Sequence, residues 1–433
     1  MLSIDSSNAQ SNTHLHDILL SEHNYINKLK PLLNFISFLE HSPRLPSQNF
    51  FMLIRPRGFG LSLATESIES ILIRDELLID HIEHISQNEL SHYNLGDYPV
   101  LHFSFTQSKL DNIETFTACL AESIQKQIWE HHVKIKTESS PDLRLQLLQL
   151  IQQLAAKEAK PVVILIDNYD APIAMVRHIT ALEEQQQALA LYYELLNVFR
   201  QAGTLVKFCL LTGHAKFALS NDISEGLPHV IDLSFSDITA DLLGFTRKEI
   251  ETYFADDLKR LAPQQGVTVE EYLQILEDCY GGFVFSDKMQ KVLCPRSVAR
   301  AFENDGALFA YSCEYNYAFL QDVLGQNNTD VDWLIDKDGQ DQLLLEEIDL
   351  NPKGKQLGSL LLQQGLATVN KVTFSVQEHS LSWRYRFGIP NVEMRRVFNI
   401  LTRKARPSLR ELPINSRVYD AGEEEYLIPP KEE

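Results

Sequence analysis

The first half of the chain alternates short apolar runs with longer segments whose apolar residues recur every three or four positions. Four runs have the length of a strand, at residues 50–54, 98–103, 161–166 and 206–212. The run at 161–166 is continuously apolar, as expected for a strand that helices cover on both faces. Helical periodicity occurs at residues 13–44, 62–73, 113–133, 140–159 and 183–201. This alternation predicts an α/β core with a parallel sheet.

The pattern changes after about residue 240. Thr246 and Glu249 form the signature of a capping box, and helical periodicity then dominates to about residue 348. A helix near 354–364 and three short β-like runs indicate a small α+β module that is winged-helix-like. We therefore divide the chain into an N-terminal helical segment, an α/β core, a helical lid lobe, the small module and an acidic flexible tail, with boundaries at 1–44, 45–240, 241–350, 351–405 and 406–433.

The charge of the chain narrows the classes of partner. Lys and Arg number 39 and Asp and Glu number 59 in 433 residues, a formal charge of −20. Bulk binding of nucleic acid needs a cationic surface, so we do not expect it. No apolar stretch approaches the roughly 20 residues that span a bilayer, and the N-terminus lacks a secretory signal. Five widely spaced cysteines without a C-x-x-C motif predict reduced thiols, so we expect a cytoplasmic protein without a membrane partner.

A strand, a glycine-bearing turn and a helix follow one another near residue 55, which is the layout of a phosphate-binding loop. Such loops place backbone N–H groups and a helix N-terminus around phosphate oxygens. The eight positions of the G-x-x-x-x-G-K-[ST] pattern hold Arg55, Pro56, Arg57, Gly58, Phe59, Gly60, Leu61 and Ser62. Gly60 and Ser62 match, whereas Arg55 replaces a glycine and Leu61 replaces the lysine. A structural turn before a helix is the alternative interpretation.

Two later strands end in polar residues that suit the same chemistry. Asp167 follows an apolar strand, the position from which a carboxylate reaches the water shell of Mg²⁺. The acid that usually follows is Asn168, which cannot accept a proton, and Asp170 is the candidate to replace it. Thr212 and Lys216 follow the next strand, where a γ-phosphate sensor would lie. Capping roles for Asp167 and Ser62 remain the alternative.

Ten ordered segments together carry a family resemblance. They lie at residues 25–28, 51–62, 98–103, 165–173, 211–217, 243–246, 280–285, 294–298, 365–368 and 389–393. In this order and spacing the chain resembles the bacterial AAA-ATPase-like proteins, which usually carry a C-terminal PD-(D/E)XK nuclease-like domain. The resemblance covers about residues 15–400 and implies a P-loop NTPase-like core that binds ATP and Mg²⁺.

The departures from that family decide the functional hypothesis. Family members read approximately R-P-R-R-F-G-K-S in the loop and L-I-D-E-Y-D at the acidic strand end, whereas this chain has Gly58, Leu61 and Asn168. Family members continue past the segment at 389–393 into the nuclease-like domain, and we expect this chain to lack it. Loss of the lysine predicts about 100-fold weaker triphosphate binding, because charge-assisted hydrogen bonds contribute about 1.5–3 kcal/mol each.

Three hypotheses follow. The leading one is a pseudo-ATPase that binds an unknown protein partner, with weak or no hydrolysis of nucleotide. The second is a working ATPase with a rearranged site, in which Arg55 or Arg57 supplies the charge and Asp170 the catalytic carboxylate. The third is a bacterial effector secreted into a host cell, since the glutamate-rich end at 423–433 resembles a type IV export signal. A frayed acidic tail is the simpler interpretation of that segment. We interpret His102 and His214 as structural residues, and Arg296 with Arg300 as a surface pair.

Overall fold

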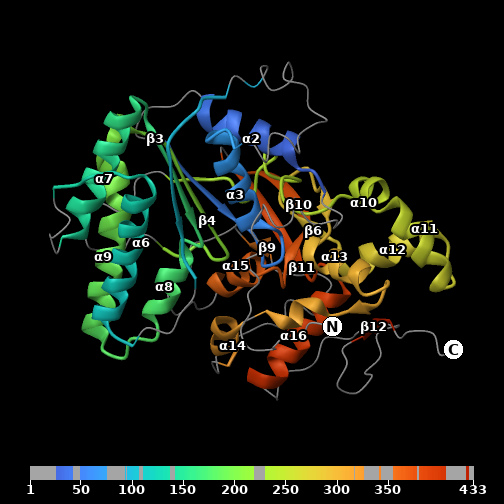
Figure 1. The fold of residues 1–433 in the computed structure, drawn as a ribbon. Helices are drawn as coiled ribbons and strands as arrows, with labels where there is room; N and C mark the ends of the chain where they lie inside the picture. The colour runs from blue at the N-terminus through green and yellow to red at the C-terminus, as the bar shows by residue number, and fades with distance from the viewer. Residues whose placement is uncertain are drawn as a thin grey trace, which may run out of the picture.

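The fold is seen in a computed structural model of the whole chain (Figure 1). The residues that the structure describes are 26–41, 49–75, 93, 95–106, 111–136, 142–218, 230–315, 317–325, 341–342, 355–377, 380–405 and 426–428. The predicted helix at 13–44 is therefore seen only in its second part, as α2 (Leu29–His41).

A five-stranded parallel sheet forms the core of the first half. Its strands are β1 (Phe50–Ile54), β2 (Val100–Ser104), β3 (Val162–Asp167), β4 (Val206–Gly213) and β5 (Ile231–Asp232). They lie in the order β2-β3-β4-β1-β5, and every neighbouring pair is parallel. The α/β fold and four of the five strands were predicted from the apolar runs. The two-residue strand β5 was not, because its side chains are only half-buried.

Helices cover both faces of this sheet (Figure 1). One face carries α2 and α3 (Leu61–Leu72), and the other carries a three-helix layer. That layer consists of α6 (Ile113–Glu130), α7 (Leu143–Glu158) and α9 (Leu182–Gln201). Between β3 and α9 lies a short helix that the periodicity did not predict, α8 (Asp170–Val176), and a 3-10 turn, η2 (Gly203–Leu205), leads into β4. The sheet is thus buried on both sides, which explains its unbroken apolar strands.

The second half begins with a helical lobe that has its own apolar core. Its helices are α10 (Arg247–Tyr253), α11 (Ala255–Gln264), α12 (Val269–Tyr280) and α13 (Pro295–Glu303). The predicted capping box at Thr246 and Glu249 is present. Short strands that were not predicted interrupt the helices, namely β6 (Phe283–Val284), β7 (Lys291–Val292) and β8 (Leu308–Phe309). The 3-10 helix η3 (Tyr311–Glu314) and α14 (Ala318–Leu324) follow.

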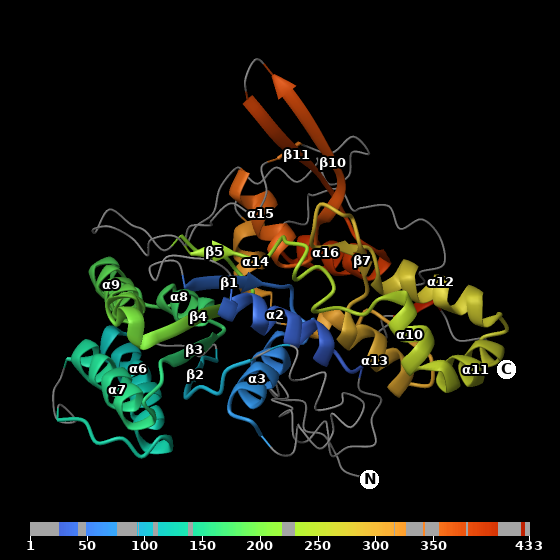
Figure 2. The ribbon, with the colours of Figure 1, turned by 90° about the horizontal axis from the view of Figure 1, so that it is seen from above.

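The C-terminal module contains two helices and a long hairpin. Helix α15 (Lys355–Gln363) precedes strands β10 (Thr368–Gln377) and β11 (Ser380–Gly388), and β9 (Asp341–Gln342) adds a third strand. The hairpin projects away from the body of the molecule, as Figure 2 shows. Helix α16 (Val392–Ala405) follows, and β12 (Tyr426–Ile428) pairs with β8. The module is α+β as predicted, and its likeness to a winged helix stays a prediction.

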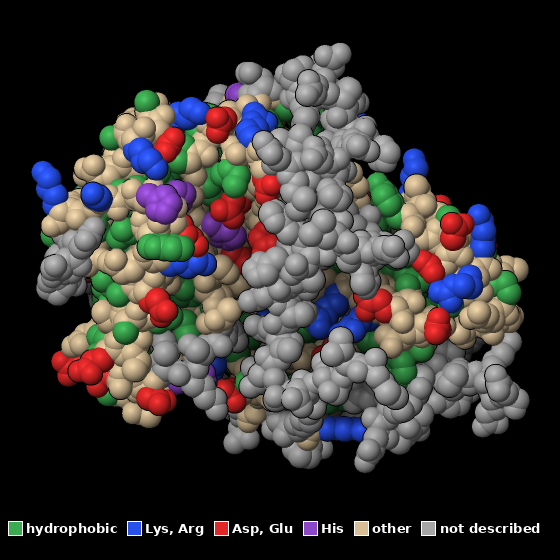
Figure 3. Space-filling view, viewed as in Figure 1, with side chains coloured by type: hydrophobic (Ala, Val, Ile, Leu, Met, Phe, Trp, Pro, Cys, Tyr) green, Lys and Arg blue, Asp and Glu red, His purple; other side chains and the backbone are tan. Residues whose placement is uncertain are grey.

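Two further features are the distribution of surface charge and the apolar length of the helices. On the face shown in Figure 3, acidic and basic side chains are interspersed over the described parts of the surface. Among the described helices, none is long and apolar enough to cross a membrane. Most of the predicted tail lies outside the described residues, so its role as an export signal stays a prediction.

Candidate functional site

The carboxyl ends of β1, β3 and β4 meet at one edge of the sheet because β4 lies between the other two. The Arg55 N–H donates to the Gly213 carbonyl at 3.1 Å, and the Tyr169 N–H donates to the Thr212 carbonyl at 2.9 Å. These bonds bring the three segments that were predicted to carry chemistry side by side. The predicted site is therefore one place in the fold.

The loop at residues 55–62 turns sharply into α3. Gly58 and Gly60 have φ angles of +85° and +76°, in the left-handed region that glycine adopts at little cost. Gly60 is the N-cap of α3, so the first N–H groups of the helix are free to face a ligand. Leu61 is 4% exposed and packs into the core. The Ser62 side chain is exposed, and its hydroxyl makes no hydrogen bond to any described residue.

Arg55 is committed to the backbone around it. The guanidinium donates to the carbonyls of Ile54, Ser234 and Thr239 at 2.9, 2.7 and 2.6 Å. It also lies 4.1 Å from the centre of the Phe285 ring. Complete burial lowers the pKa of Arg55 to about 9. The side chain thus anchors the start of the loop to the segment after β5.

Arg57 and Asp170 each keep a buried polar atom without a hydrogen bond among the described residues, as does Arg55 at its Nε. Asp170 is 4% exposed; its Oδ2 accepts from the His214 N–H at 3.2 Å, and its buried Oδ1 has no partner in the described part of the chain. The Nε atom of Arg57 is also buried without a hydrogen bond there. Burial raises the pKa of Asp170 to about 6, although the charge of Arg57 opposes the shift. The two groups are near enough to interact, but no ion pair joins them among the described residues.

Asp167 is hydrogen-bonded to the end of β4, and no hydrogen bond joins it to Ser62 among the described residues. It is 2% exposed, and the Thr212 hydroxyl donates to its Oδ1 at 2.9 Å. Thr65 on α3 lies 3.4 Å from the Thr212 hydroxyl oxygen. Asn168 has a φ of +57°, a left-handed conformation that asparagine tolerates better than glutamate. The backbone at this turn is therefore one that suits asparagine.

The end of β4 is held by contacts with other elements. Lys216 forms an ion pair with Asp232 of β5 at 3.0 Å. The His214 Nδ1–H donates to the Arg55 carbonyl at 2.9 Å, so this histidine is structural, in agreement with the sequence interpretation. Burial, with a further effect of the Arg57 charge, lowers the pKa of His214 to about 3. The Gln364 amide donates to the His214 carbonyl at 2.7 Å and connects this strand end to the C-terminal module.

The lid lobe closes over the loop at Gly58. The Gly58 carbonyl accepts from the Arg296 N–H at 3.2 Å and from the Cys294 thiol at 3.7 Å. A Cβ atom at Gly58 would overlap the Tyr315 hydroxyl, and the Arg296 guanidinium lies 5.4 Å from the Tyr315 ring centre. We call Cys294, Arg296 and Tyr315 the clamp. Sequence reasoning did not predict this contact, although the segment at 294–298 was among those that carried the family resemblance.

Aromatic packing fixes the other side of the loop. The Phe59 ring meets those of Phe283 and Phe285 edge-on, with ring centres 4.9 and 5.3 Å apart. A Cβ atom at Gly365, which follows α15, would lie 2.8 Å from the Pro56 side chain. The loop therefore contacts both the lid lobe and the C-terminal module. These contacts need the absence of a side chain at Gly58 and Gly365 and the edge-on packing of the Phe59 ring.

These contacts allow a test of whether the site fits ATP and Mg²⁺. The helix N-terminus at Gly60 is open, since nothing lies within 4 Å of a Cβ atom built there. The lysine position is apolar and buried, and the Arg55 guanidinium is engaged. No cluster of three or more His, Cys, Asp or Glu residues that could hold a metal ion occurs among the described residues. The loop therefore offers an open helix N-terminus without the usual ammonium group, and its failure to bind a triphosphate–magnesium complex stays a prediction.

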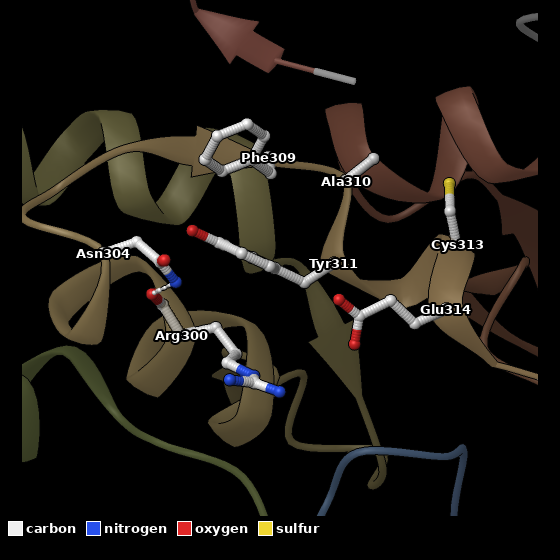
Figure 4. Close-up of a pocket in the computed structure, with 7 residues that line it drawn as sticks. All are labelled: Arg300, Asn304, Phe309, Ala310, Tyr311, Cys313 and Glu314. Carbon is white, nitrogen blue, oxygen red and sulfur yellow. Dashed lines mark hydrogen bonds between the residues drawn. The ribbon is translucent and has the colours of Figure 1, made fainter. Parts of the chain in front are cut away.

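A pocket lies elsewhere, in the lid lobe. It has a volume of about 460 Å³ and is lined by Arg300, Asn304, Phe309, Ala310, Tyr311, Cys313 and Glu314 (Figure 4). Most of its polar groups already have partners: the Tyr311 hydroxyl donates to the Ala307 carbonyl at 2.8 Å, and the Asn304 amide donates to the Arg300 carbonyl at 2.7 Å. None of the predicted site residues lines this pocket.

Comparisons with known proteins give a family model that matches the first half of the chain and a relative that matches most of it. Residues 18–223 match the family model described as predicted AAA-ATPase. An uncharacterized protein in the vnfD 5′ region of Azotobacter chroococcum mcd 1 is 24% identical over 351 residues, which are 81% of this chain and 62% of that protein. The chain thus spans less than two thirds of this relative. No solved structure matches this chain. The ATPase-like resemblance is supported over the matched residues, and the degenerate site stays a prediction.

Proposed function

We propose that this protein is a pseudo-ATPase, an AAA-ATPase-like α/β scaffold that acts by binding a partner protein and hydrolyses nucleotide weakly or not at all. The observation that carries the proposal is Leu61. This side chain is 4% exposed in the apolar core at the position where a phosphate-binding loop presents an ammonium group. Of the two arginines in the loop, Arg55 is bound to three carbonyl groups. The loop is therefore left without the ammonium group that usually contacts the polyphosphate, and Arg57 is its one remaining cation.

The test is calorimetry with Mg-ATP together with an assay of phosphate release, on the wild-type chain and on Leu61→Lys. We expect no binding at micromolar ATP and no turnover in the wild type. Leu61→Met serves as the matched control, because methionine has a similar volume and no charge. Micromolar binding by the wild type that Leu61→Lys leaves unchanged, or steady phosphate release, would refute the proposal.

A second candidate function is favoured by Arg57 and Asp170. Both have buried polar atoms without a partner among the described residues, next to the helix N-terminus. In this alternative the protein is an ATPase with a non-standard loop: Arg57 would contact phosphate oxygens, and Asp170, with a pKa of about 6, would accept a proton from water. Arg57→Ala and Asp170→Asn distinguish the candidates, because both would abolish any phosphate release that the wild type shows.

A further inference from the structure

Three segments that the sequence singled out, but that the nucleotide chemistry does not use, pack against one another. They lie at residues 280–285, 294–298 and 389–393. The Asn391 amide donates to the Gly281 carbonyl at 2.7 Å, and the Cys294 N–H donates to the Tyr280 carbonyl at 2.9 Å. Gly282 has a φ of +84°, and a Cβ atom there would overlap the Pro390 carbonyl oxygen. These segments therefore form one assembly.

Glu393 lies at the centre of this assembly. It is fully buried in the first turn of α16, where the helix dipole favours a carboxylate. The Ser297 hydroxyl lies 3.1 and 3.0 Å from its two oxygens, and the Ser312 N–H donates to Oε1 at 2.9 Å. No cation pairs with Glu393 in the described part of the chain. One carboxyl group thus joins α16 to both α13 and η3.

Those two elements carry the clamp. Cys294 is the N-cap residue of α13, and its thiol sulfur lies 3.5 Å from the Ser297 hydroxyl. Tyr315 is the C-cap residue of η3, and its N–H donates to the Ser312 carbonyl at 3.3 Å. A continuous series of contacts therefore runs from Glu393 through two serines to the residues that touch Gly58.

We propose that Glu393 is a positioning residue that locks α16 to the clamp, so that the C-terminal helix controls whether the loop at 55–62 is covered or open. The proposal deepens the proposed function, since it names the regulation of the same loop, and it rests on that function only for what the opened loop would bind. A partner that draws α16 away would remove three hydrogen-bond contacts from α13 and η3 and release Tyr315 from Gly58.

Cys294 offers a direct readout of the clamp. Its side chain is 1% exposed, and burial raises the pKa of the thiol to about 12, so it is unreactive while the clamp is closed. Cys209 in β4 is also fully buried and reports opening of the sheet. The ratio of the two labelling rates therefore separates a local opening of the clamp from general unfolding.

The experiment measures alkylation of Cys294 and Cys209 by peptide mass spectrometry on the full chain, with Cys119→Ser and Cys313→Ser to remove the partly exposed thiols. We expect Glu393→Ala to raise the Cys294 rate, relative to Cys209, about ten-fold or more. Glu393→Gln keeps an acceptor for the Ser312 N–H and should stay within about three-fold of the wild type. Glu303→Ala is the matched control, because that exposed carboxylate at the end of α13 pairs with Arg300 and, among the described residues, with neither serine nor the clamp.

Ser297→Ala is the second variant, for use if Glu393→Ala does not fold, and we expect it to raise the same ratio several-fold. An unchanged ratio in Glu393→Ala, or in Ser297→Ala if the first variant does not fold, would overturn the proposal. So would an equal rise at both cysteines, or a Glu393→Gln chain as reactive as Glu393→Ala. Because this readout contains no nucleotide, it stands or falls separately from the measurements of ATP binding and turnover.

Discussion

The contact between Gly58 and Tyr315 lets us predict how much stability the substitution Gly58→Ala would cost. In Gly58→Ala the new Cβ atom meets two obstacles, the φ of +85° and the Tyr315 hydroxyl. A left-handed conformation costs an L-residue about 1–2 kcal/mol, and overpacking of a filled space costs about 1–3 kcal/mol. We therefore expect the free energy of unfolding to fall by about 2–5 kcal/mol.

A double-mutant cycle separates the two contributions. Tyr315→Phe removes the hydroxyl and leaves the Cys294 sulfur at 3.0 Å and a ring carbon at 3.2 Å from the new Cβ, so most but not all of the steric cost should be relieved. The coupling between the two substitutions should be about 1–3 kcal/mol, within the range for residues in contact. Gly60→Ala is the matched control: its φ is +76°, but nothing lies within 4 Å of its Cβ, so it should cost only the backbone contribution.

The assay is urea unfolding followed by tryptophan fluorescence, with the four chains of the cycle and the Gly60 variants measured together. Equal losses in Gly58→Ala and Gly60→Ala would show that Tyr315 does not close over the loop. A Tyr315→Phe substitution that stabilises Gly60→Ala as much as Gly58→Ala would refute the same reasoning, because the rescue would then not depend on contact.

Three further predictions concern the strand ends. Gly213→Ala should destabilise the chain by about 1–3 kcal/mol, because its Cβ would overlap Asp170 Oδ1, and Gly213→Ala in an Asp170→Ser background should cost less by urea unfolding. Asp170 should make the stability depend on pH, because burial raises its pKa from 3.8 to about 6. The stability that this group contributes below pH 4 is lost as the pH rises through 6, and the stability then stays level. Asp170→Asn should remove this loss in unfolding curves measured at several pH values. His102 pairs with Glu69 at 2.6 Å, and although burial lowers its pKa, Glu69 and neighbouring acids raise it overall. The stabilising contribution of this pair is complete below the unfolded pKa of about 6.5 and is lost as the pH rises through the higher folded pKa. The loss of stability in His102→Gln, measured by thermal unfolding relative to the wild type, should therefore be smaller above about pH 8 than at low pH. A loss that does not change with pH would contradict the assignment.

The strands and the main helices could be predicted because their signals are local. The continuous apolar run of β3 and the capping box at Thr246 each need only a few adjacent residues. Short elements such as β5 and α8 were missed, because two and seven residues give too few repeats of the pattern to distinguish.

The sequence could predict that the candidate residues lie close together, but not the contacts that they make. The positions of Asp167, Asp170 and Thr212 at neighbouring strand ends follow from a parallel sheet. Two of the three carbonyls that the Arg55 guanidinium binds, those of Ser234 and Thr239, lie 179 and 184 residues later in the chain. Such long-range partners have no signature in the residues next to Arg55.

The sequence by itself determined the α/β class, the order of the strands along the chain and the absence of a lysine from the loop, because each is written in adjacent residues. Only the tertiary structure decided that the loop lies under Tyr315 and that a buried carboxylate on α16 connects to that contact. The physical reason is that packing and hydrogen bonding join residues by distance in space, and Gly58, Tyr315 and Glu393 are far apart along the chain.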